Sequence, residues 1–243
     1  RGVAFFGRDS ESTLPVWSAR DGYPGNPNYR EFHRDLGWDL SIDNLKKLGI
    51  NEKRPLGIKL FKISSKNTSL ANKQEYDPKA AKESARIDAD NYLKERKKQL
   101  LKLEKSMQID PLLIAPFDAE LFGHWWFEGP QFLSNIFIKS KKEGINLITL
   151  KEALQITSKI QLCNPSPSSW GKGGFHDYWL DNSNAWIVHE WSKAGREMIN
   201  ICSEGLIEES NIKIICQAGR ELLLCQSSDW SFILKAGTTT ELA

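Results

Sequence analysis

Two carboxylates, a histidine and two adjacent tryptophans occur within the short stretch Asp118–Trp126. The stretch directly follows the continuous apolar run Pro111–Phe117, which is typical of a buried strand in a parallel sheet. In parallel βα folds, ligands lie beyond the carboxyl ends of the strands, so an acid at that place is a candidate catalytic group. Asp118 is therefore a candidate general acid/base, and Glu120 could project to the same side. The alternative is that Asp118 only caps or pairs within the rim of the fold.

The aromatic residues next to Asp118 favour glycoside chemistry. A carboxyl group beside aromatic rings is poorly solvated, which favours its protonated form and suits a general acid. Glycoside cleavage needs two carboxyl groups across the scissile bond, one of which donates a proton. His124 is less suited to metal binding, because the four histidines show no HxxxH-type or His-Cys spacing. We therefore predict no metal site.

A second aromatic cluster lies in the Gly- and Ser-rich stretch 168–186. Trp170, Trp179 and Trp186 are not at helical spacing, which favours a stacking platform for a sugar, since sugar rings present an apolar face. The alternative is a packed tryptophan cluster that pins the helical region to the rest of the fold. Asp229 lies beside Trp230 in "CQSSDW" and offers a similar pairing, although this segment could equally be a helix-capping turn.

The composition excludes several classes of protein. The net charge of +2 gives no support for binding to nucleic acid or to an acidic membrane surface, and no run of about 18 apolar residues occurs. The four cysteines show neither CxxC spacing nor the density of a disulfide scaffold, so we expect a reducing, cytoplasmic location.

The predicted elements alternate between strands and helices in the first two thirds of the chain. Strand, loop, helix and strand in this order indicate a βα barrel or a doubly wound α/β fold, and after about residue 155 the pattern becomes all-α. A polar loop rich in Gly and Pro, which contains Trp17, covers residues 10–32. Predicted strands are 3–6, 56–64, 111–117 and 145–150, and predicted helices are 77–106, 128–144, 185–205 and most of 212–234.

Four blocks of sequence carry a specific resemblance. Residues 6–40, 117–130, 168–186 and 222–234 together resemble the 1,4-α-glucan branching enzymes of glycoside hydrolase family 57, in the order in which that family has them. The resemblance implies an α/β fold, in which residues 1–155 are the C-terminal part of an incomplete (β/α)7 barrel. Residues 156–243 would then form the α-helical domain that follows the barrel.

The resemblance also implies a mechanism and a set of site residues. A Glu nucleophile attacks the anomeric carbon, Asp118 acts first as acid and then as base, and a second glucan's 6-hydroxyl accepts the chain to form an α-1,6 branch. No cofactor is implied. The motifs place Arg8, Gly25, Trp170 and Asp229 at glucan-contacting positions and put an aromatic residue at Trp179. We add His124 and Trp17 as candidate substrate-binding residues.

This sequence departs from the family in ways that affect the function. The block that carries the nucleophile is absent, as is the family's N-terminal His-containing motif, and Asp88 stands where a histidine is expected. The expected partners are therefore an α-1,4-glucan and the missing N-terminal half of the same enzyme, and the chain alone is expected to be inactive. Alternatives are a family 57 α-amylase or 4-α-glucanotransferase, a non-catalytic glucan-binding fragment, and an inert remnant that does not fold by itself.

Overall fold

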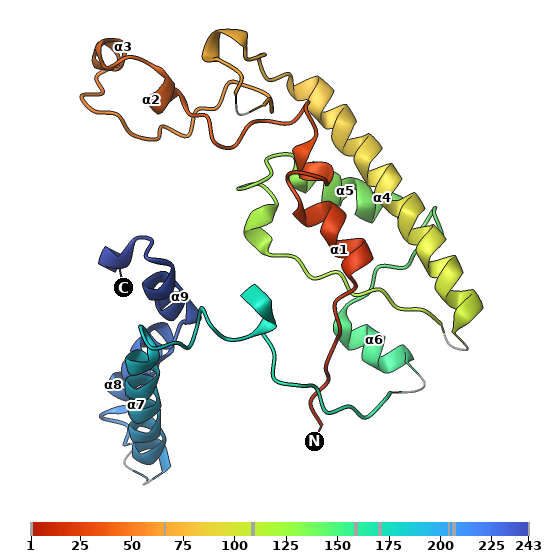
Figure 1. Cartoon of the computed structure of the whole chain (residues 1–243). Helices are drawn as coiled ribbons and strands as arrows, with labels where there is room; N and C mark the ends of the chain where they lie inside the picture. The colour runs from red at the N-terminus through yellow and green to blue at the C-terminus, as the bar shows by residue number, and fades with distance from the viewer. Residues whose placement is uncertain are drawn as a thin grey trace. The chain divides into compact units, whose positions relative to one another are not determined.

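The computed structural model describes residues 2–65, 67–107, 110–157, 160–169, 172–203, 205 and 208–242. The chain divides into two units, Arg1–Ser158 and Lys159–Ala243 (Figure 1). The first unit contains α1 (Ser10–Trp17), α2 (Leu36–Asp39), α3 (Ile42–Lys47), α4 (Pro78–Ser106), α5 (Gly129–Lys139) and α6 (Leu150–Ile156), with 3₁₀ turns at Tyr23–Gly25, Leu70–Asn72 and Ala119–Leu121. The second unit contains α7 (Ala185–Ser203), α8 (Ile212–Cys225) and α9 (Ser228–Ala236), with 3₁₀ turns at Lys172–Gly174 and Thr240–Leu242.

Helix α4 is the main support of the first unit, and the prediction of a helix over residues 77–106 is confirmed. The Asp77 carboxylate accepts a hydrogen bond from the Lys79 backbone N–H at 2.9 Å, and Pro78 occupies the first helical position, where its missing N–H has no cost. The buried face begins with alanines 81, 85 and 89, which allow α5 to pack closely against α4 (Figure 1).

Aromatic rings fill the core between α4, α5 and the loops that lie over them. The ring centroid of Phe132, which is fully buried on α5, lies 4.8 Å from that of Trp126, 5.4 Å from that of Tyr23 and 5.8 Å from that of Tyr92. Tyr29 packs on the other side of Trp126, with 5.5 Å between ring centroids. The loop that carries Trp126 therefore rests on the core of the unit.

The predicted strands at 3–6, 56–64, 111–117 and 145–150 are not formed as strands. Across the described ranges the structure contains isolated β-bridges only, and Val3 is 98% exposed where a buried strand was predicted. Asp9 donates its backbone N–H to the Ile114 carbonyl at 2.8 Å, so the segments around these two residues do touch. The apolar pattern is compatible with strands, but a strand also needs neighbours along its length.

Three short extended segments form the largest paired region. Residues 29–31 lie antiparallel to residues 61–63 through the Arg30–Lys62 bridge, and residues 60–62 lie antiparallel to residues 74–76 through the Phe61–Glu75 bridge. We call these three segments the ribbon. Residues 29–31 form an outer edge of the ribbon, and residues 32 and 33 continue the chain from that edge.

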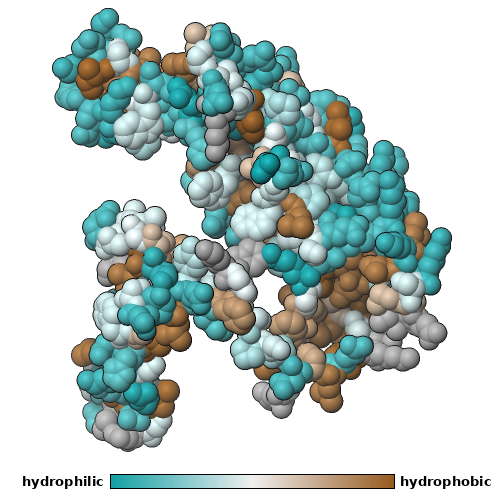
Figure 2. Space-filling model, in the orientation of Figure 1, coloured by the Kyte–Doolittle hydropathy of each residue, from teal (hydrophilic) through white to brown (hydrophobic). Residues whose placement is uncertain are grey.

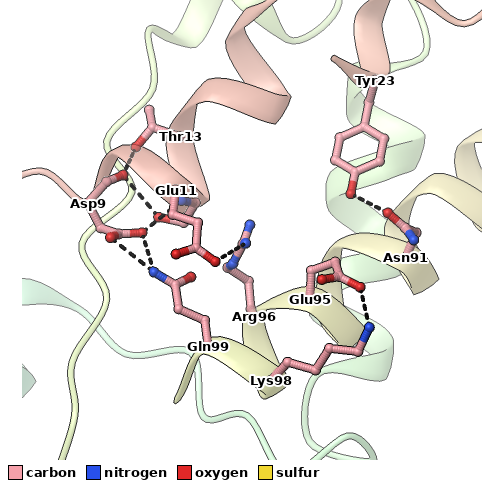
Figure 3. Close-up of polar contacts among 10 residues, drawn as sticks. Asp9, Glu11, Thr13, Tyr23, Asn91, Glu95, Arg96, Lys98 and Gln99 are labelled. Carbon is pink, nitrogen blue, oxygen red and sulfur yellow. Dashed lines mark hydrogen bonds and ion pairs between the residues drawn. The ribbon is translucent and has the colours of Figure 1, made fainter. Parts of the chain in front are cut away.

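The loop predicted over residues 10–32 begins with a helix. Asp9 caps α1 by accepting a hydrogen bond from the Ser12 backbone N–H at 2.7 Å. The Gln99 side chain on α4 donates to both Asp9 carboxylate oxygens at 3.0 Å, as Figure 3 shows, so this residue joins α1 to α4. The prediction missed α1 because Pro15 lies inside it, and proline usually ends a helix.

The second unit is helical in the described ranges, in line with the all-α pattern of the last third. Asn184, which is fully buried, joins the loop before α7 to α9, because its amide donates to the carbonyls of Tyr178 and Ser231 at 3.0 Å each. The ring of Tyr178 stacks on Phe232 of α9 with 5.0 Å between centroids. One buried amide therefore holds the 176–184 loop on α9.

Candidate active site

Asp118 lies at the start of a tightly closed loop in the first unit. Its backbone is extended and precedes the Ala119–Leu121 turn, and its side chain is exposed. It does not cap that turn, and within the part of the chain that the structure describes no group donates a hydrogen bond to its carboxylate. An exposed carboxylate of this kind is free to approach a ligand.

Backbone hydrogen bonds fix the loop that follows Asp118. Trp125 N–H donates to the Glu120 carbonyl at 3.1 Å, and Gly123 N–H donates to the Trp126 carbonyl at 2.8 Å. Gly123 has a φ of 105°, which residues with a side chain rarely adopt. The two tryptophans consequently face opposite ways, since Trp126 is 2% exposed and Trp125 is 51% exposed.

The exposed rings of the loop meet a phenylalanine from the edge of the ribbon. The centroid of the Phe32 ring lies 4.5 Å from that of Trp125 and 5.4 Å from that of His124. His124 and Trp125 are themselves 5.2 Å apart. We call these three rings the aromatic shelf: His124 and Trp125 are exposed on the same loop as Asp118, and Phe32 is half-buried at the edge of the ribbon. An apolar surface of this kind suits the C–H face of a sugar.

Arg8 is positioned by the residue next to it. Burial of the Asp9 carboxyl opposes its ionisation, but hydrogen bonds from Ser12 and Gln99 outweigh this effect and lower its pKa. The backbone of Asp9 also contacts Ile114, four residues before Asp118. The two candidate residues Arg8 and Asp118 are therefore carried by segments that touch, and Arg8 is exposed.

Gly25 lines an open hollow of about 470 Å³ between the loop after α1 and helix α4. A Cβ atom on Gly25 would lie 2.3 Å from the Ala19 carbonyl oxygen, so this close approach requires glycine. The Tyr23 hydroxyl, which also lines the hollow, donates to Asn91 of α4 at 2.7 Å (Figure 3). Trp17 is half-buried and packs against the core at the end of α1.

Asp88, where the resemblance had led us to expect a histidine, serves a polar network. It accepts hydrogen bonds from the Tyr29 hydroxyl at 2.5 Å and from the Asn26 amide at 3.0 Å. Burial raises its pKa, an effect that these two donors partly offset. The network ties the Gly25 loop to α4.

The remaining candidate residues belong to the second unit. Trp179 is half-buried with its ring 5.9 Å from that of Phe232, and Asp229 is exposed in the first turn of α9, where it accepts a hydrogen bond from the Ser227 hydroxyl at 2.7 Å. Trp186 is a helical residue in the first turn of α7 and does not belong to a loop. Trp170 lies outside the described residues.

Two residues at or beside the candidate site, Phe32 and Glu128, were not predicted from the sequence. Phe32 contacts Trp125, and Glu128 contacts Arg30, in each case more than 90 positions away along the chain, which no local pattern reveals.

Among the described residues, no group of three or more His, Cys, Asp or Glu side chains could hold a metal ion. No helix in those ranges is both long and apolar enough to cross a membrane.

Comparisons with known proteins find similarity to 1,4-alpha-glucan branching enzymes. Residues 190–243 match a family model described as "1,4-alpha-glucan branching enzyme, C-terminal". The chain is 33% identical, over 99% of its length, to the 1,4-alpha-glucan branching enzyme of Thermococcus kodakarensis, of which it covers 34%. It is 28% identical to a probable 1,4-alpha-glucan branching enzyme of Mycobacterium tuberculosis, covering 99% of the chain and 44% of the relative.

Solved structures give the same result. The crystal structure of the GH57 branching enzyme of Thermococcus kodakaraensis matches with a TM-score of 0.78 and 30% identity, over 97% of this chain and 40% of the other. An α-amylase of Thermotoga maritima, AmyC, matches with a TM-score of 0.77 and 35% identity, over 98% of this chain and 45% of the other. The chain thus spans less than half the length of these relatives, and along nearly all of its own length it is similar to one part of a GH57 branching enzyme.

Proposed function

We propose that this chain is part of a 1,4-alpha-glucan branching enzyme, in which Asp118 acts as the general acid/base. The observation that carries the proposal is the exposed Asp118 carboxylate at one end of the loop that carries the aromatic shelf. A stacked glucan would expose its glycosidic oxygens at the edge of the rings, where a carboxyl group can protonate them. The similarity to branching enzymes over 99% of the chain supports the same substrate class, an α-1,4-glucan.

The second carboxylate of this chemistry would come from a companion segment. In a retaining mechanism a nucleophile attacks the sugar on the face opposite the acid, so Asp118 alone cannot complete the reaction. We propose that the N-terminal half of the enzyme supplies the Glu nucleophile and pairs with the extended segments at 3–6, 111–117 and 145–149. Residues 1–155 would then complete a (β/α)7 barrel, and residues 156–243 would be its α-helical domain. We place this enzyme in the cytoplasm, in glycogen synthesis.

In that assembly the other candidates would bind glucan. Arg8 would contact the substrate from the segment beside Ile114, and Gly25 and Trp17 would do so from the loop after α1. Trp170, Trp179 and Asp229 would contribute from the second unit. Trp179 is only half-buried where it packs on Phe232, so part of this residue remains accessible to a ligand.

A chimera tests the catalytic part of this proposal. The chain would replace the matching third of the Thermococcus kodakarensis enzyme, and the product would be incubated with amylose and analysed for α-1,6 linkages. We expect new α-1,6 linkages, and a loss of about 10²- to 10⁴-fold in rate when Asp118→Asn removes the proton donor. Asp110→Asn is the matched control, because Asp110 is an exposed aspartate outside the loop. An Asp118→Asn chimera with full activity would exclude the acid/base role.

The α-amylase alternative is supported by the similarity to AmyC, which is as close as that to the branching enzymes. The same chimera distinguishes the two functions. Shortened amylose without new α-1,6 linkages would support hydrolysis and would exclude branching.

The glucan-binding part can be tested on the isolated chain. Glycogen cast into a native gel should retard the chain, and Trp125→Ala should reduce this retardation by removing a stacking ring. Trp38→Ala is the matched control, because Trp38 lies outside the shelf and its 52% exposure is close to the 51% of Trp125. Equal retardation of both variants would remove the shelf from the proposed site. Asp118→Asn should still be retarded, since stacking does not need the carboxylate.

A further inference from the structure

Glu128 is a buried carboxylate that the proposed reaction does not use. Its side chain is 2% exposed, although it lies only two residues beyond the buried Trp126 at the end of the Asp118 loop. It stands immediately before α5, where a side chain often caps the first turn, yet it makes no capping hydrogen bond to α5. A buried carboxylate is costly unless it binds a donor, so its actual partners are informative.

The partner of Glu128 is the edge of the ribbon. Glu128 Oε1 accepts a hydrogen bond from the Arg30 backbone N–H at 3.1 Å. This N–H points away from the neighbouring segment, because the hydrogen bonds between the two segments are made by Ile63 N–H to the Tyr29 carbonyl and by Glu31 N–H to the Phe61 carbonyl. Glu128 thus supplies the acceptor that a further strand would otherwise provide.

Two more contacts strengthen the same junction. The Arg30 guanidinium lies 3.6 Å from the centroid of the Phe127 ring, and the ring of Tyr76, from the third segment of the ribbon, lies 6.2 Å from Phe127. The Tyr76 hydroxyl lies close enough to the Glu128 carboxyl to affect its pKa, while Glu128 Oε2 is buried and has no hydrogen-bond partner among the described residues. Phe127 and Glu128 together connect the end of the Asp118 loop to two segments of the ribbon.

The aromatic shelf lies two or three residues from this junction on both segments, the edge of the ribbon and the Asp118 loop. Phe32 follows Arg30 by two residues, and Trp125 precedes Glu128 by three. The segment that carries Phe32 also meets the loop through ring contacts, of Tyr29 with Trp126 and of Phe32 with His124 and Trp125. We propose that Glu128 is a positioning residue, which holds the edge of the ribbon against the Asp118 loop so that Phe32 and Trp125 form one continuous glucan-stacking surface. The stacking role rests on the proposed function, but the positioning role does not.

Fluorine NMR of the full chain tests the positioning directly. The chain would be labelled with 5-fluorotryptophan, and the resonance of Trp125 would be assigned with Trp125→Phe. Phe32→Leu removes the ring that stacks on Trp125 and so gives the position of the unstacked resonance. We expect Glu128→Leu, which has similar volume and no acceptor, to move the Trp125 resonance toward that position. Glu128→Gln keeps an oxygen for the Arg30 N–H and should leave the resonance in place.

Controls separate positioning from a general loss of structure. Glu120→Gln changes an exposed carboxylate of the same loop and should not move the Trp125 resonance. The buried Trp126 reports on the core, so its resonance should stay in place in every variant that remains folded. If Glu128→Leu unfolds the first unit, Tyr76→Phe removes only the hydroxyl beside the carboxyl and should shift Trp125 in the same direction by less. An unmoved Trp125 resonance in folded Glu128→Leu, or in Tyr76→Phe when Glu128→Leu unfolds, would overturn the proposal.

Glycogen affinity then links the positioning to binding. We expect Glu128→Leu to bind glycogen about three- to tenfold more weakly than the native chain, and Glu128→Gln to bind as the native chain does. A native chain that is not retarded by glycogen would contradict the proposed function while the NMR result still decides the role of Glu128. Native affinity in a Glu128→Leu variant whose Trp125 resonance has moved would show that the shelf does not bind glucan.

Discussion

The loop at Asp118–Glu128 and the loop at His176–Asn184 both contain aspartate, histidine and tryptophan but use their aromatic residues differently. Each is short, irregular and attached to its unit by one buried polar side chain, Glu128 in the first and Asn184 in the second. In the first loop Trp125 is 51% exposed, whereas in the second both aromatic rings lean on Phe232 of α9. The exposed ring of Trp125 therefore offers more surface to a ligand than the half-buried ring of Trp179 does.

The attachment of each loop differs in charge as well. Glu128 can lose a proton, and burial raises its pKa, an effect that the Tyr76 hydroxyl and the Arg30 backbone and side chain partly offset. Asn184 cannot titrate. The stability of the first unit should therefore depend on pH and on the packing of the core beneath its loop. The stability of the second unit should depend mainly on the amide of Asn184.

The largest effect is expected from the core beneath the first loop. Phe132→Ala removes the ring that packs on Trp126, and should reduce the free energy of unfolding of the first unit by about 3–5 kcal/mol. Peptide-resolved hydrogen exchange would measure this in each unit separately. Phe137→Ala, on the same helix but 66% exposed, should change it by less than about 0.5 kcal/mol. Equal effects in the two units would contradict the difference between the loops.

Removal of the buried amide tests the second loop. Asn184→Ala leaves the carbonyls of Tyr178 and Ser231 without this donor, and should destabilise the second unit by about 2–3 kcal/mol. Urea unfolding followed by hydrogen exchange of peptides from α9 would measure it. Asn182→Ala is the control, because Asn182 is exposed in the same loop. Similar losses for both variants would mean that Asn184 does not hold the loop.

A smaller effect should appear when pH is varied. In the folded first unit the pKa of Glu128 lies above its ordinary value, so between those two pKa values the folded state binds more protons than the unfolded state. Stability should therefore fall as pH rises through this window, and Glu128→Gln should flatten the fall. The pKa of Asp88 is also raised, but Asp88 is present in both the native chain and Glu128→Gln, so it contributes equally to both. The pKa of Asp9 is lowered, so this carboxyl stays ionised throughout the window. Parallel curves of unfolding free energy against pH for the native chain and Glu128→Gln would contradict the prediction.

The smallest effect concerns a partly exposed ion pair between Asp181 of the second loop and Lys235 of α9. Lys235, which bonds to Asp181, and the Ser183 hydrogen bonds together hold the pKa of Asp181 well below its ordinary value. Lys235→Met should raise this pKa toward the ordinary value, as measured by NMR titration of the carboxyl group. Because a lowered pKa stabilises the folded state above the ordinary pKa, the variant should lose less stability on acidification. An unchanged titration would show that the pair is not formed in solution.

Features that depend on neighbouring residues were predictable from the sequence, and those that depend on distant residues were not. The start of α4 follows from Asp77 and Pro78. The capping box of Thr149 and Glu152 is a local signal of the same kind for the start of α6, although a strand was predicted up to residue 150. Asp118, His124 and Trp125 share one loop and were found together. Phe32 escaped notice because its contacts lie across the chain.

The predicted strands failed for a related reason. The run at 111–117 has the composition of a buried strand, but pairing depends on a second segment in register, and composition does not reveal whether such a segment is present. Asp9 and Ile114 make one backbone hydrogen bond where a ladder was expected. The roles of Arg8, Gly25, Trp17, Trp170, Trp179 and Asp229 stay predictions, since they depend on a bound ligand.

The unpaired extended segments also determine how the chain will behave at high concentration. Figure 2 shows hydrophobic surface gathered around α6 and the chain beside it, where Leu147, Ile148 and Ile156 are exposed. Peptide groups without sheet partners next to such surface are a template for intermolecular pairing. Solutions of the isolated chain should scatter more light as they are concentrated, and a peptide that pairs with these segments should clear them.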